Sequence, residues 1–316
     1  MSEKKIIAVT GATGAQGGGL ARAILNDKNS SFAVRAITRN TNSDKAKELA
    51  KLGAEIVEAN LDNLDSLKKA FEGVYGAYCV TNFWEHYSPE KEGTQAQNMA
   101  LAAKHNNLKH VIWSTLEDTR KWIPLEDNRM PTLMEKYKVP HFDGKGQADH
   151  YFTDSGVPAT ILLTSLYWVN FIYFGMGPKK GEDGKYYITF PMGDKKLSGI
   201  AAEDIGKCAY GIFKKNGEYK GKTVAIAGEH ITCSRMAEIL SKVLGVEIFY
   251  QDIPAEVYRN LGFPGAQDLG NMFQFYNEFA DYFTGIRDIN IAKKLNPELQ
   301  NFETWARKNK DKIPLG

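Results

Sequence analysis

Three glycines spaced three residues apart stand near the start of the chain, in the run Gly11-Ala12-Thr13-Gly14-Ala15-Gln16-Gly17. An apolar β-branched stretch precedes this run and a helical pattern follows it. Gly11 permits a tight turn, Gly14 lets the backbone approach a diphosphate, and Gly17 lets the helix pack closely on the strand. The N-terminus of such a helix offers unpaired N–H groups and the positive end of its dipole to phosphate. The run therefore predicts a dinucleotide site, with an ordinary glycine-rich turn as the alternative.

A basic residue, Arg39, follows the second predicted strand. Sites that prefer NAD place Asp or Glu at this point, where the carboxylate binds the 2′-hydroxyl of the ribose. The turn Ile37-Thr38-Arg39-Asn40 contains no carboxylate, and a guanidinium suits a 2′-phosphate or stacks on adenine. Arg39 therefore predicts that NADP(H) is preferred over NAD(H). The alternative is that Arg39 is a solvated surface charge.

Two further loops at strand ends are expected to contact the cofactor. After the third strand, Asn60 and Asp62 are candidates for hydrogen bonds to adenine, although a capped helix start explains them nearly as well. After the fourth strand, Thr81, Asn82 and Phe83 should line the ribose and the nicotinamide. Bulky aromatic residues at the C-terminal end of a strand fit a ligand crevice better than a solvated loop.

The catalytic residues of doubly wound reductases are only partly present. Such enzymes use a Tyr and a Lys four residues apart on one helix face, where the Tyr passes a proton and the Lys holds the ribose. In the run His141-Phe142-Asp143-Gly144-Lys145 the lysine is kept, but His141 stands at the tyrosine position. Lys145 can keep the cofactor-binding role, and a histidine can in principle donate a proton at neutral pH. Ser114 ends the fifth strand, where these enzymes keep a catalytic serine, with a strand-end cap as the alternative.

These candidates need a scaffold that brings strand ends together, and the pattern along the chain predicts one. Apolar runs alternate with helical patterns, with strands expected at residues 5–10, 32–38, 54–59, 74–80, 110–113 and 160–163 and helices at 20–25, 43–52, 64–71, 90–105 and 142–152. This alternation is typical of α/β proteins with a doubly wound parallel sheet. We expect a Rossmann domain at residues 1–155, with sheet contributions from about 157–165 and 197–228, and a smaller interleaved α+β cap at 166–316.

The composition excludes several classes of function. Forty Lys and Arg against 38 Asp and Glu leave a net charge of +2 over 316 residues, so no basic face for direct nucleic-acid binding is expected. Cys79, Cys208 and Cys233 form no C-x-x-C pair, which argues against a zinc site or a disulfide framework and fits an intracellular protein. The uncharged stretch 155–178 is interrupted by Pro and Gly, so no membrane span is expected. We expect a cytoplasmic protein, with nuclear entry left open.

Four motifs resemble the NmrA-like family, including the redox-sensor proteins of eukaryotes within it. They are residues 10–18 (TGATGAQGG), 80–85 (VTNFWE), 141–146 (HFDGKG) and 261–269 (LGFPGAQDL). The resemblance implies an atypical short-chain dehydrogenase/reductase fold that binds NADP(H) and lacks the Tyr-x-x-x-Lys pair. It also implies that many members are regulators whose shape, dimerisation or partner binding changes with the state of the cofactor.

The resemblance also assigns residues to the cofactor. It places the dinucleotide turn at Gly11, Thr13, Gly14, Ala15, Gln16 and Gly17, the 2′-phosphate contact at Arg39, the adenine loop at Asn60 and Asp62, and the nicotinamide side at Thr81, Asn82 and Lys145. This chain departs from the family after the sixth strand. Members often have an Arg-x-Pro segment there, but residues 163–170 (LTSLYWVN) contain neither Arg nor Pro.

Two functions of different classes follow from these observations. The first is an NADP(H)-binding redox sensor or regulator with a regulatory protein partner, compatible with a homodimer and without efficient turnover. Such a sensor must bind the oxidised and reduced cofactor differently, since equal affinity shifts no equilibrium; otherwise cofactor occupancy could order the proline-broken segment 116–140. The second is an NADPH-dependent oxidoreductase for quinones or carbonyl compounds, in which the aromatic stretch 166–171 would wall a flat substrate pocket unless it is simply core. A scaffold that binds no cofactor is a third alternative.

Overall fold

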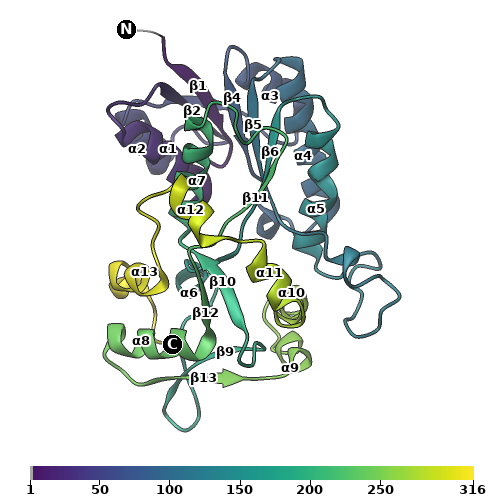
Figure 1. The fold of residues 1–316 in the computed structure, drawn as a ribbon, viewed down its shortest axis with the longest axis vertical. Coiled ribbons are helices and arrows are strands. Elements are labelled where there is room, and N and C mark those ends of the chain that lie inside the picture. Colours follow the sequence, from purple (N-terminus) through teal and green to yellow (C-terminus); the bar gives the residue numbers. More distant parts are fainter. Residues whose placement is uncertain (1–2) are drawn as a thin grey trace.

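The computed structural model describes residues 3–316, and its largest element is a sheet of seven parallel strands in the order β11-β6-β5-β4-β1-β2-β3. Figure 1 shows this sheet in the upper half of the molecule. The strands are β1 (Lys5–Val9), β2 (Phe32–Thr38), β3 (Glu55–Glu58), β4 (Gly76–Cys79), β5 (His110–Thr115), β6 (Ala159–Leu163) and β11 (Thr223–Ala225). The prediction of a doubly wound parallel sheet is confirmed.

Helices cover both faces of this sheet because its strands are apolar on both sides. Side chains alternate along β1, so that Ile7 and Val9 join the core on one face and Ala8 joins the core on the other. The helices of the first face are α1 (Ala15–Asn26), α2 (Asp44–Lys51) and α7 (Ala202–Lys214), and those of the second are α3 (Leu64–Ala70), α4 (Pro89–His105) and α5 (Pro140–Thr153).

The C-terminal region forms two small sheets with helices around them, in the lower half of Figure 1. One sheet joins β7 (Leu166–Tyr167), β10 (Lys196–Ile200) and β12 (Glu229–Thr232), and the other joins β8 (Lys179–Lys180), β9 (Tyr186–Phe190) and β13 (Ile248–Asp252). The helices are α6 (Asn170–Tyr173), α8 (Cys233–Leu244), α9 (Ala255–Arg259), α10 (Ala266–Glu278), α11 (Ala280–Gly285), α12 (Ile289–Leu295) and α13 (Phe302–Lys308). We call these two sheets together with α6, α8 to α11 and α13 the cap region. The chain returns from it to the large sheet through α7 and β11.

The aromatic stretch 166–171 belongs largely to the core of the cap region. Trp168 and Phe171 are fully buried and pack against Phe302 and Trp305. The interpretation of the whole stretch as a substrate wall is therefore wrong for these two residues, because no ligand can reach them without opening the core. Only Tyr167 turns toward the large sheet, where its hydroxyl meets Gln16.

The segment 116–140, expected from its prolines to be mobile, is anchored instead. It contains a short 3₁₀ helix, η2 (Thr119–Lys121). The fully buried carboxylate of Asp143 accepts hydrogen bonds from the backbone N–H groups of Thr119, Lys138 and Val139. The Lys138 side chain is also buried, and its Nζ donates to two carbonyl oxygens within the same segment at 2.7 Å. Within residues 3–316, no helix has the length and apolar character needed to cross a membrane, and no group of His, Cys, Asp and Glu side chains is arranged to hold a metal ion.

The contact between α1 and α7 generates a prediction about two glycines. A Cβ on Gly206 of α7 would lie 2.1 Å from the backbone nitrogen of Leu20 in α1, whereas a Cβ on Gly93 of α4 would meet nothing within 4 Å. We expect Gly206→Ala to destabilise the protein by about 2 kcal/mol or more through overpacking. Gly93→Ala, the matched control, should stabilise it by about 0.5–1 kcal/mol, because alanine favours a helix. Urea unfolding followed by circular dichroism measures both, and equal effects of the two substitutions would contradict this packing.

Candidate functional site

The order of the strands reverses between β1 and β4, which are neighbours in the sheet although β2 and β3 separate them in the sequence. In open parallel sheets, ligands bind in the crevice outside the carboxyl ends of the strands at such a point. The glycine turn follows β1, and residues 81–87, which include the 3₁₀ helix η1 (Phe83–Glu85), follow β4. The structure therefore brings these two predicted segments to the same crevice.

The glycine turn has the geometry that its sequence predicts. Gly11 has a φ of +59°, which is unfavourable for residues with a side chain, and it accepts a hydrogen bond from the N–H of Gly14 at 2.8 Å. A Cβ on Gly17 would lie 2.5 Å from the Gly11 carbonyl oxygen, so α1 can approach the turn only because Gly17 has none.

The first turn of α1 differs from those of α2, α3 and α4, the helices that follow β2, β3 and β4. Its N-cap is Gly14, which provides no side-chain cap, and no acidic residue stands in its first turn. By contrast, Ser43, Asn63 and Ser88 cap α2, α3 and α4 through their side chains. The N-terminus of α1 therefore offers N–H groups and the positive end of a helix dipole to an external acceptor such as a phosphate.

The side chain of Gln16, in the same turn, is held by partners that the sequence analysis did not identify. Its Oε1 accepts hydrogen bonds from the hydroxyls of Ser114 at 2.7 Å and Tyr78 at 2.6 Å, and its Nε2 donates to Tyr167 at 2.5 Å. Ser114 is therefore buried and already engaged as a donor. Burial raises the pKa of Tyr167 to about 12, so its hydroxyl stays protonated at neutral pH. The only signal for these tyrosines in the sequence is their place at or just after the carboxyl ends of strands.

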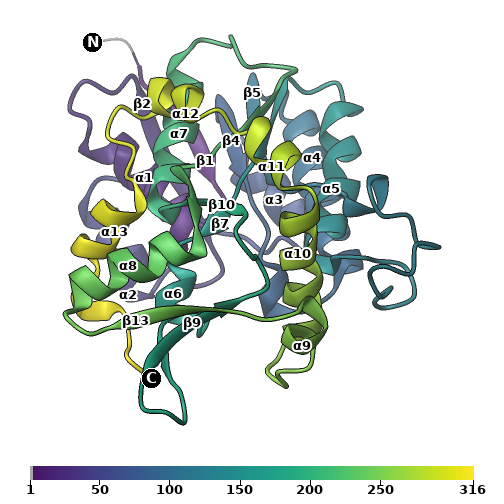
Figure 2. The same cartoon turned by 60° about the horizontal axis from the view of Figure 1, so that its bottom comes forward.

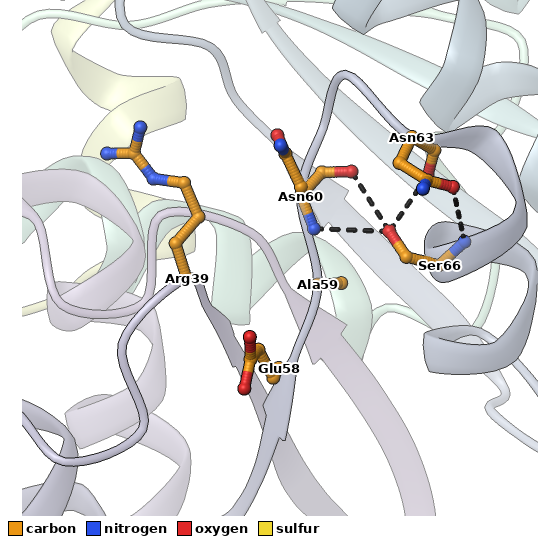
Figure 3. Close-up of a pocket in the computed structure, with 6 residues that line it drawn as sticks. All are labelled: Arg39, Glu58, Ala59, Asn60, Asn63 and Ser66. Carbon is orange, nitrogen blue, oxygen red and sulfur yellow. Dashed lines mark hydrogen bonds between the residues drawn. The ribbon is translucent and has the colours of Figure 1, made fainter.

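A cavity of about 400 Å³ lies beside the carboxyl ends of β2 and β3. It is lined by Arg39, Glu58, Ala59, Asn60, Asn63 and Ser66. Figure 3 shows Arg39 on one side of this pocket and Asn60 on the other, with Glu58 below them. Two of the residues predicted for the adenine end of the cofactor therefore share one pocket. The sequence analysis did not identify Glu58 as a pocket residue, because no local motif marks the end of its strand.

Asp62, the other adenine candidate, is engaged within the protein. Its Oδ1 accepts a hydrogen bond from Gln95 at 2.9 Å and its Oδ2 lies 3.3 Å from the Nζ of Lys91, both on α4. The hydrogen bond from Gln95 and the charge of Lys91 lower the pKa of Asp62, so it is ionised at neutral pH. Asp62 does not line the cavity described above.

Arg39 also has a partner that local sequence could not reveal. Its guanidinium makes an ion pair with Glu85, the last residue of η1. The turn around Arg39 contains no carboxylate, as the sequence analysis noted, but the fold brings one from 46 residues away.

The positive charge of Lys145, at the crevice, is paired with a carboxylate of the protein. Its Nζ donates to the Oγ1 of Thr81 at 2.5 Å and lies 3.0 Å from the Oε1 of Glu92 in α4. Glu92 is completely buried, whereas 12% of the Lys145 side chain is exposed. Lys145 and Thr81, both predicted for the nicotinamide side, are thus in contact. Glu92 therefore compensates the positive charge of Lys145 within the protein.

His141 lies on the same helix as Lys145, and it joins the crevice to the cap region. Its Nδ1 is 2.5 Å from the Oδ1 of Asp268 in α10, and its backbone N–H donates to Oδ2 of the same carboxylate at 3.2 Å. The rings of Phe83 and Trp84 pack on the imidazole, with centroid distances of 5.9 and 4.9 Å. Figure 2 shows α10 passing in front of the sheet near α5. Phe83 is buried in this contact, whereas Asn82 beside it is exposed.

The Arg and Pro of the family segment after β6 are absent here, but an arginine that follows α11 contacts the same strand ends. Arg287, between α11 and α12, is fully buried and lies 2.8 Å from Glu117, which follows β5. It also donates to the carbonyl oxygen of Thr164, which follows β6, at 2.6 Å. The carboxyl ends of β5 and β6 are therefore tied together by a residue that is distant in sequence.

Comparison with known proteins identifies one family over nearly the whole chain. The family model described as NmrA-like family matches residues 3–306. The NmrA-like family domain-containing oxidoreductase malD of Malbranchea aurantiaca is 31% identical over 257 residues, which cover 78% of this chain and 75% of the relative.

Solved structures show the same fold at lower identity. Nmra, a negative transcriptional regulator, has been solved in complex with NAD and in complex with NADP; each structure is 23% identical, has a TM-score of 0.79, and is matched over 97% of this chain and 95% of its own. An NADPH-dependent quinone oxidoreductase of Escherichia coli is 22% identical with a TM-score of 0.70, over 96% of this chain and 98% of its own.

The pair of Lys145 and Glu92 generates a prediction about stability. Lys145→Met leaves the buried carboxylate of Glu92 without its counter-charge, so we expect a loss of about 3 kcal/mol in the free energy of unfolding. Adding Glu92→Gln should recover more than about 1 kcal/mol of that loss, because the unpaired charge is gone. Urea unfolding of both variants measures this, with Lys104→Met, an exposed lysine of α4, as the control that should change little. A double variant no more stable than the single one would contradict the pairing.

Proposed function

Because the chain belongs to the NmrA-like family, we propose that it binds NADP(H) across the crevice and acts as a redox sensor or regulator without efficient turnover. The diphosphate would be held by the backbone of residues 11–17, and the adenosine 2′-phosphate by Arg39. Thr81 and Lys145 would contact the nicotinamide side. Regulation of this kind calls for a protein partner and is compatible with a homodimer.

One observation carries the binding proposal: the uncapped N-terminus of α1 lies where the strand order reverses, and the pocket of Arg39 and Asn60 lies at the carboxyl ends of the next strands, β2 and β3. The diphosphate in the middle of a dinucleotide requires N–H donors, and the 2′-phosphate at its adenosine end requires a positive group such as a guanidinium. The structures of Nmra with NAD and with NADP support the same use of this fold.

The polar groups at the nicotinamide side support binding more than turnover. Ser114 donates to Gln16, Lys145 is matched by Glu92, and His141 is held by Asp268. A bound NADPH would supply a hydride, but the usual tyrosine that exchanges a proton with the substrate is replaced here. The loss of a general acid typically lowers a rate by about 10²–10⁴.

Contacts between the crevice and the cap region supply a route for regulation. His141 and Lys145 lie one turn apart on α5, and His141 is bonded to Asp268 in α10. Trp84, beside the predicted nicotinamide contacts, packs so closely on Gly265 at the start of α10 that a Cβ there would lie 2.9 Å from its ring. A cofactor form that favours one arrangement of these contacts would shift the position of the cap region, provided that it binds the two arrangements with different affinity.

The second candidate is an NADPH-dependent oxidoreductase for quinones or carbonyl compounds. The names of the relative from Malbranchea aurantiaca and of the E. coli quinone oxidoreductase favour it. The structure adds one feature in its favour, since a histidine bonded through Nδ1 to a carboxylate is an arrangement that general acids and bases use.

Binding is tested by a charge reversal at the 2′-phosphate position. We expect Arg39→Asp to weaken NADP⁺ binding by about 10-fold to 100-fold, because charge-assisted hydrogen bonds contribute about 1.5–3 kcal/mol. NAD⁺ binding should change far less, since it has no 2′-phosphate. Calorimetric titration measures both, with Arg235→Asp as the control, since Arg235 is an exposed arginine of α8 in the cap region that pairs with Glu238. Equal losses for the two dinucleotides would show that Arg39 does not contact the 2′-phosphate.

Turnover separates the two candidate functions. We expect the wild-type protein to oxidise NADPH more slowly than about 1 s⁻¹ with every member of a panel of quinones, since ordinary enzymes begin near that rate. The measurement is the fall in NADPH absorbance in the stopped-flow instrument. A faster rate that His141→Asn abolishes would establish the oxidoreductase and overturn the sensor.

A further inference from the structure

We propose that Glu85 sets the preference of this chain between NADP(H) and NAD(H), by holding the Arg39 guanidinium until a 2′-phosphate replaces its carboxylate. The inference rests on the proposed function, because it requires a nicotinamide dinucleotide in the crevice. It adds a specificity-determining residue that contributes no attraction to the cofactor and competes with it instead.

The position of the ion pair in the sheet is the first argument. Arg39 follows β2 and Glu85 follows β4, and these strands flank β1 on opposite sides in the sheet. The two side chains therefore meet across the carboxyl end of β1, where the glycine turn lies. A dinucleotide whose diphosphate rests on this turn, with its adenosine toward the pocket of Arg39 and Asn60, must meet the pair between Arg39 and Glu85.

The exposure of the pair is the second argument. The side chains of Arg39 and Glu85 are 64% and 44% exposed, so water competes for both charges. Exposed ion pairs are weak and worth at most about fivefold in an equilibrium. A phosphate dianion forms shorter and often bidentate hydrogen bonds with a guanidinium, so it can displace the carboxylate. NAD(H) carries a hydroxyl at the 2′ position, so it leaves the ion pair between Arg39 and Glu85 intact.

The residue before Glu85, Trp84, gives this exchange a consequence in the cap region. Trp84 precedes Glu85 in η1, and its ring contacts His141 at a centroid distance of 4.9 Å and Phe174 at 5.4 Å. The same ring covers Gly265 at the start of α10. If η1 shifts when Glu85 leaves Arg39, Trp84 moves against α10, and the 2′-phosphate at one end of the crevice is then coupled to the cap region at the other.

The experiment compares NADP⁺ and NAD⁺ binding in the wild type and in Glu85→Gln at low ionic strength, where surface charges are least screened. We expect Glu85→Gln to lower the Kd for NADP⁺ by about threefold to fivefold, because the competing charge is removed. The Kd for NAD⁺ should stay within about twofold. The matched control is Glu48→Gln, which removes a similarly exposed partner of an arginine, Arg22, and should leave the ratio of the two constants unchanged.

Each outcome decides a different question. A ratio of the two constants in Glu85→Gln equal to that of the wild type overturns the role of Glu85 while leaving the proposed function intact. A wild-type protein that binds neither dinucleotide overturns the proposed function and this inference with it. The coupling is read from tryptophan fluorescence, in which saturating NADP⁺ should produce a larger change than saturating NAD⁺ and Trp84→Phe should remove the difference. Equal changes with the two dinucleotides overturn the coupling.

Discussion

The close approach of bare backbone around the first glycine turn is the constraint on which the rest of the site depends. Gly17 lets α1 begin directly against the turn, and Gly206 in turn lets α7 press on α1. The N-cap residue of α1, Gly14, has no side chain, so the first N–H groups of this helix have no side-chain cap. The glycines that allow this close packing therefore also leave N–H donors at the crevice.

Every charged candidate around this crevice is matched by a partner inside the protein. Arg39 pairs with Glu85, Lys145 with Glu92, and His141 with Asp268. Burial explains the last two pairs, because a buried charge or polar group without a partner is destabilising. Burial does not explain the pair of Arg39 and Glu85, which is exposed to water. Separating Arg39 from Glu85 costs little free energy because water solvates both charges. The pair lies where the 2′-phosphate of NADP(H) would distinguish it from NAD(H).

The cap region closes the other side of the crevice through buried polar contacts. Arg287 joins Glu117 and the carbonyl of Thr164, and Asp268 joins His141, so residues from beyond the large sheet hold the carboxyl ends of its strands. Such contacts hold the cap region against the large sheet, because breaking one of them would leave a buried polar group without its partner.

The amino-acid sequence by itself determined the sheet, the glycine turn, the place of Arg39 after a strand and the place of Lys145 on a helix. These features follow from periodicity, from the missing Cβ of glycine and from local capping, as the side-chain cap of α3 by Asn63 shows. Only the tertiary structure decided which polar groups meet, since the partners of Arg39, His141 and Gln16 come from 46, 127 and 151 residues away. The energy of an ion pair depends on distance and burial, and neither quantity is encoded in the residues next to it.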